Sequence, residues 1–69
     1  MQSSKIRKLE EKIASHERVI EEHRRKIEAE ERKPNPNKEV IRHWQREIEG
    51  HQKAIQRYKE RLEKLKKKH

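Results

Sequence analysis

The chain has 69 residues and a formal net charge of +8, with 26% hydrophobic and 49% charged residues. This composition excludes a globular core. It fits either a disordered chain or long exposed helices with a narrow apolar seam. One glycine and two prolines are too few for a flexible linker. The absence of cysteine excludes disulfides, thiolate metal sites and thiol catalysis.

The N-terminal residues lack the hydrophobic stretch of a signal peptide, and no apolar run approaches the ~20 residues of a membrane span. We therefore expect a soluble, cytoplasmic protein. A chain this small without disulfides or a metal needs good packing or a partner to be stable.

The first half shows an isoleucine every seven residues, at heptad position a: Ile6, Ile13, Ile20 and Ile27. Position d begins with Leu9 and continues with His16 and His23. Charged residues flank this repeat, which is typical of a coiled-coil helix. The pattern predicts a helix over residues 4–33.

A Pro-Asn turn over about 34–37 interrupts the repeat. Because a residue before proline is pushed out of the α region, the first helix should end near Lys33. Pro36 fits the first turn of a second helix over about 36–67. Asn35 is then the expected N-cap, with Asn37 as the neighbouring option.

The second half resumes the heptads from Ile41. Pairing residues whose numbers add to 71 places each a position opposite a d position, from Ile27 with Trp44 to Ile6 with Leu65. The sequence predicts an all-α antiparallel two-helix coiled-coil hairpin, one domain over 1–69. Its core seam is Ile6, Leu9, Ile13, Ile20, Ile27, Ile41, Trp44, Ile48, Ile55, Tyr58, Leu62 and Leu65.

Val19, Ala54 and Val40 stand at g positions, where charge is more usual. They widen the apolar stripe and suggest that the hairpin dimerises into a four-helix bundle. The alternative is that small residues are tolerated on a monomer surface. In outline the chain resembles the repressor-of-primer hairpin family, which implies a homodimer that binds RNA. This resemblance is one of architecture and transfers no residue role.

His16, His23 and His51 all stand at d positions and should cluster at mid-hairpin, near Glu17 and Glu47. They are weak candidates for a metal site, because His16 and His23 are two helical turns apart and cannot share one ion. Half-buried polar residues that fix register are another interpretation. A third is pH-sensitive association, since a half-buried imidazole disfavours its charged form and acid should loosen the assembly.

The open end of the hairpin should be strongly basic. Residues 1–12 hold four Lys/Arg and two Glu, and residues 57–69 hold seven Lys/Arg and two Glu, so together they carry +7 of the net charge. These cations could bind phosphates or an acidic partner, or only keep the chain soluble. The candidates are Lys5, Arg7, Lys8, Arg57, Lys64, Lys66, Lys67 and Lys68.

No catalytic constellation is present, so we expect neither an enzyme nor a cofactor. Trp44 and Tyr58 are expected to pack in the core. The sequence favours a coiled-coil protein-protein interaction or structural module whose partner is a second copy or another helical protein. A small basic nucleic-acid-binding hairpin is the main alternative. A designed helical scaffold is a further one, given the all-isoleucine a positions.

Overall fold

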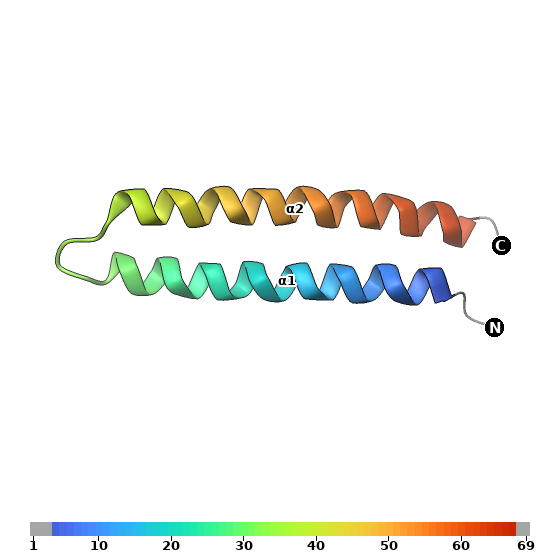
Figure 1. Ribbon diagram of the computed structural model, residues 1–69, viewed down its shortest axis with the longest axis horizontal. Helices are drawn as coiled ribbons and strands as arrows, with labels where there is room; N and C mark the ends of the chain where they lie inside the picture. Colours follow the sequence, from blue (N-terminus) through green and yellow to red (C-terminus); the bar gives the residue numbers. More distant parts are fainter. Residues whose placement is uncertain (1–3, 68–69) are drawn as a thin grey trace.

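The computed structural model describes residues 4–67 and shows two helices lying side by side and antiparallel (Figure 1). Helix α1 spans Ser4–Glu31 and helix α2 spans Lys38–Lys67. The Cα atoms extend over 54 × 16 × 11 Å. Within the described range the chain is entirely helical apart from the connection, which confirms the predicted all-α hairpin.

The N-cap of α2 is Asn37. Its side-chain oxygen accepts hydrogen bonds from the backbone N–H of Glu39 at 3.1 Å and of Val40 at 3.3 Å. These are the N2 and N3 donors that a capping residue satisfies. The first choice from the sequence, Asn35, was therefore wrong. Pro36 precedes the helix instead of occupying its first turn.

Glu30 closes the connection from the other side. One carboxylate oxygen accepts the backbone N–H of Asn37 at 3.1 Å, and the other accepts Lys33 Nζ at 3.1 Å. These two donors, the Asn37 N–H first, lower the pKa of Glu30 below its ordinary value. This contact ties Asn37 to the end of α1 and holds it outside α2, which explains where the second helix begins.

The core is a single row of apolar side chains between the helices. Five of the twelve predicted seam residues are buried, at 7–9% exposure: Leu9, Ile13, Ile20, Ile48 and Ile55. The other seven are half-buried, and no described side chain is fully enclosed. Neither described helix contains a segment long and apolar enough to cross a membrane. Two helices alone thus leave much of their seam in contact with solvent.

Candidate functional site

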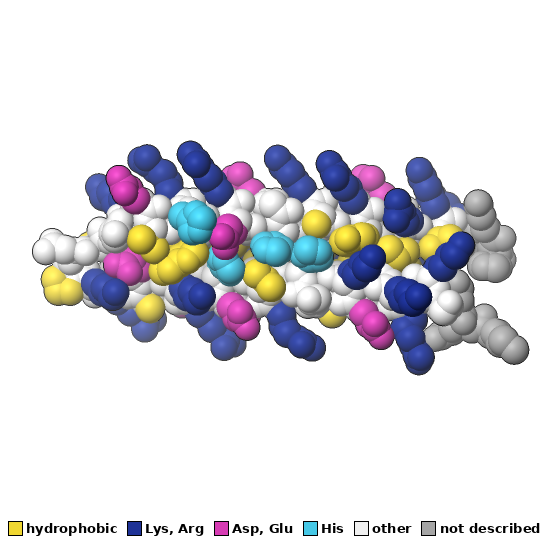
Figure 2. Space-filling view, in the orientation of Figure 1, with side chains coloured by type: hydrophobic (Ala, Val, Ile, Leu, Met, Phe, Trp, Pro, Cys, Tyr) yellow, Lys and Arg dark blue, Asp and Glu magenta, His cyan; other side chains and the backbone are white. Residues whose placement is uncertain are grey.

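The histidines predicted at d positions meet at mid-hairpin, on one face of the seam. Figure 2 shows histidine side chains along the groove between the helices, with hydrophobic side chains on either side. His16 Nδ1 lies 2.7 Å from His51 Nδ1, and the ring centroids are 4.9 Å apart. One ring must donate and the other accept, so only one of the two Nδ1 atoms carries a proton in this contact.

Further ring contacts extend the cluster along the seam. The His16 ring stacks on Tyr58 at 5.8 Å between centroids, and the His51 ring meets the edge of His23 at 6.2 Å. Lys12 Nζ lies 5.6 Å from the Tyr58 ring centroid. The predicted register places His16 opposite Ile55. The two rings that contact His16 belong to His51 and Tyr58, which lie about one helical turn before and after Ile55.

A second polar contact between the helices joins His23 to Glu47. His23 Nδ1 faces the backbone carbonyl oxygen of Val19 at 2.8 Å, and its Nε2 binds one oxygen of the Glu47 carboxylate. His43 Nε2 binds the other carboxylate oxygen at 2.9 Å. The hydrogen bond from His23 is the main cause that lowers the pKa of Glu47.

Sequence reasoning missed the role of Glu47 and His43. It placed Glu47 near the histidines without pairing it with any of them. In the structure, both oxygens of Glu47 are occupied by imidazoles, one from His23 across the helices and one from exposed His43 on the same helix. The spacing of four residues between His43 and Glu47 was a usable signal, because such pairs are neighbours on a helix surface.

No metal centre is formed by these side chains. Among residues 4–67, no group of three or more histidines and carboxylates is arranged to hold an ion. His16 and His51 use their facing nitrogens on each other, and His23 uses both of its nitrogens on protein acceptors.

The two flanks of the seam differ. Val19, Val40 and Ala54, the proposed self-association residues, are half-buried on the flank of the histidines and Glu47. A shallow hollow of about 350 Å³ follows the opposite flank and is lined mainly by charged and polar side chains: Glu17, Ile20, Glu21, Arg24, Gln52, Ile55 and Lys59. On the histidine flank, Ala54 lines a hollow together with Arg57, Tyr58 and Arg61, so charged side chains border this flank as well.

The open end is basic, with cations exposed on both helices. The candidates Lys5, Arg7, Lys8, Arg57, Lys64, Lys66 and Lys67 are all exposed, and Lys68 lies outside the described residues. The last turn of α2 carries Lys64, Lys66 and Lys67. The helix dipole favours positive charge at this C-terminal end. A hollow of about 370 Å³ here is lined by Lys5, Leu9, Arg61 and Leu65.

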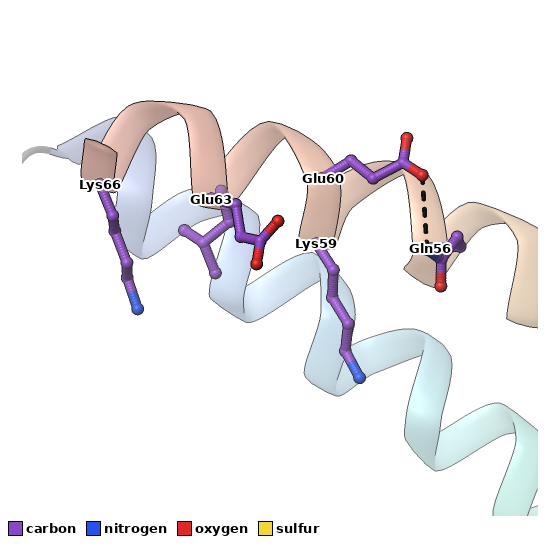
Figure 3. Close-up of a pocket in the computed structure, with 6 residues that line it drawn as sticks. Gln56, Lys59, Glu60, Glu63 and Lys66 are labelled. Carbon is purple, nitrogen blue, oxygen red and sulfur yellow. Dashed lines mark hydrogen bonds between the residues drawn. The ribbon is translucent and has the colours of Figure 1, made fainter. Parts of the chain in front are cut away.

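A further hollow on α2 has mixed charge. Figure 3 shows that its labelled side chains all come from this helix, with charged ends that fan outward instead of converging. Gln56 donates a hydrogen bond of 3.4 Å to Glu60. Lys59, Glu63 and Lys66 alternate in sign along the same stretch. This arrangement is typical of a solvated helix face and favours no ligand.

Comparison with known protein families, with curated proteins and with solved structures finds no match to this chain. Its function must therefore be argued from the hairpin itself.

Proposed function

We propose that this chain is a non-enzymatic coiled-coil interaction module that pairs with a second copy to form a four-helix bundle. The supporting observation is exposed surface. The isolated hairpin has an accessible surface of 6294 Å². A compact monomer of 8.6 kDa is expected to have roughly 4700 Å². The hairpin exposes this additional surface because it is only one layer of helices thick. A second hairpin packed against it would cover part of that surface.

The histidine flank is the proposed contact surface. Half-buried Val19, Val40 and Ala54 line it, and Arg57 and Arg61 border Ala54. The hollow on the opposite flank is lined mainly by charged and polar side chains. The 54 × 16 Å face of the hairpin gives a footprint of roughly 860 Å², close to the ~800 Å² that each partner buries in a standard interface. An antiparallel arrangement of the two hairpins keeps their basic ends apart and avoids repulsion between like charges.

Sedimentation equilibrium across a tenfold concentration range at physiological salt tests this proposal. The expected mass is twice the 8.6 kDa of the chain. Ala54→Lys should reduce the dimer fraction, because it places a charge on the apolar flank. Gln52→Lys is the matched control, since it adds the same charge to the opposite flank of the same helix and should leave the mass unchanged. A monomer at every concentration contradicts the proposal.

A second candidate function, binding to RNA or DNA, is favoured by the exposed cations at the open end. Such binding would be independent of base sequence and would weaken with salt. Replacing the lysines at 64, 66, 67 and 68 with glutamine should abolish binding to a single-stranded RNA at low salt. A control with the same charge change near the turn replaces Arg24, Lys26, Arg42 and Arg46. Equal loss in both variants would show a nonspecific charge effect, and no binding by the unmodified chain would exclude this function.

A further inference from the structure

We propose that the mid-hairpin histidines form a proton-dependent latch between α1 and α2. In this latch, acid breaks the His16–His51 contact while it strengthens the contact from His23 to Glu47. The latch lies within one chain, so it does not depend on self-association. It rests on two contacts between the helices whose hydrogen-bonding atoms require different protonation states.

Two charged imidazoles carry hydrogen on all of their nitrogens. The His16–His51 contact requires one of these hydrogens to be absent. The two Nδ1 atoms face each other at 2.7 Å, so one must be an acceptor with a free lone pair. If both rings are charged, both Nδ1 atoms carry hydrogen and the contact is lost. The unfolded chain then binds more protons than the closed hairpin, so this contact makes stability rise with pH.

The His23 contact has the opposite requirement. Its Nδ1 faces the carbonyl oxygen of Val19, and its Nε2 faces the carboxylate of Glu47. Both partners are acceptors, and an imidazole donates from both nitrogens only when it is charged. The closed hairpin therefore favours the charged form of this ring, so this contact makes stability fall as pH rises.

The groups around His16 and His51 oppose a second proton. Lys12 of α1 places its ammonium over Tyr58 of α2, and the Tyr58 ring stacks on His16. On the other side, the edge of His23 meets His51. Glu47 is the nearby carboxylate; His23 and His43 occupy both of its oxygens, and its charge also acts on His51. Glu47 therefore favours one proton on His51, while the facing Nδ1 atoms leave no place for a second proton in the pair.

Thermal unfolding followed by circular dichroism at about pH 8 and at about pH 5 separates the two contacts, because imidazoles change charge in this range. Because the two contacts respond to acid in opposite directions, the test compares variants with the unmodified chain. His51→Gln should shift the acid-induced change in melting temperature upward, and Glu47→Gln should shift it downward, each by about 4 °C or more relative to the unmodified chain. His43→Gln is the matched control, since it leaves both contacts between the helices in place and should keep the change of the unmodified chain. The same acid-induced change in the unmodified chain and in the His51→Gln and Glu47→Gln variants would overturn the proposal.

Nitrogen NMR of the unmodified chain provides a second test that needs no variant. On acidification from about pH 8 to about pH 5, His23 should carry hydrogen on both nitrogens while it keeps its contacts to Val19 and Glu47, and His16 and His51 should together keep one unprotonated Nδ1 for as long as their contact persists. A His23 that stays neutral at about pH 5, or two charged rings at positions 16 and 51 in a hairpin that keeps its cross-helix contacts, would refute the latch. Measurements at a concentration where sedimentation shows one species keep this result separate from self-association.

Discussion

The seam of the hairpin has two unlike parts. Toward the open end, apolar side chains such as Leu9, Ile13 and Leu62 pack between exposed lysines and arginines. From mid-hairpin to the turn, buried Ile20 and Ile48 continue the apolar row, and polar groups beside them join specific partners: His51, Glu47 and the Asn37 backbone. Apolar packing has no direction and contributes most of the stability. Directional contacts contribute less stability, but each fits only one alignment of the helices, so they fix the register.

The largest expected effect comes from the apolar part. Ile13→Ala should destabilise the hairpin by about 2–4 kcal/mol, because the side chain is only 7% exposed and its removal leaves a cavity. Urea unfolding followed by helical signal measures this loss. Ile6→Ala is the matched control, since the same change at a half-buried position near the end should cost clearly less. Equal losses of stability in the two variants would show that the contribution of a seam residue does not depend on its burial.

These two parts also differ in how far the sequence predicted them. The heptad repeat predicted the helices and the seam, and the short Pro-Asn connection predicted the antiparallel pairing of the helices. The repeat also predicted that His16, His23 and His51 cluster at mid-hairpin. It did not predict that Glu47 binds two imidazoles or that Glu30 reaches Asn37. Those contacts depend on rotamers and on the path of the turn, which heptad spacing does not determine.

Substitution of Asn37 measures how much its cap of α2 contributes to the stability of the hairpin, in comparison with the apolar seam. Asn37→Ala should cost about 1 kcal/mol, because the N–H groups of Glu39 and Val40 lose their side-chain acceptor. Thermal unfolding measures the effect. Asn35→Ala is the control and should change stability little, since Asn35 is not the N-cap. A larger loss from Asn35→Ala would place the start of α2 earlier than the structure does.

Gly50 is exposed on the outer face of α2, near the middle of the hairpin. A Cβ atom built there meets nothing within 4 Å, and the backbone has no positive φ. Gly50→Ala should therefore stabilise the hairpin by up to about 1 kcal/mol through helix propensity alone. The helical signal at 25 °C and the melting temperature should both rise. A loss of stability would mean that another chain contacts this face closely.

The smallest effect is expected from the charge of Glu30 and appears only as a dependence on pH. Donors from Asn37 and Lys33 lower the pKa of this carboxyl, so its folded value lies below its unfolded value of about 4.5. Its contribution to stability is thus fully present above the unfolded pKa and is lost as pH falls through the folded one. Glu30→Gln should lower the melting temperature slightly at about pH 6 and should weaken the loss between about pH 5 and pH 3. Glu28→Gln, an exposed change two residues away, should leave the acid dependence as it is. If both variants have the same profile as the unmodified chain, the Asn37 cap closes the turn without help from the Glu30 charge, and the polar part of the seam is held by the Glu47 and histidine contacts instead.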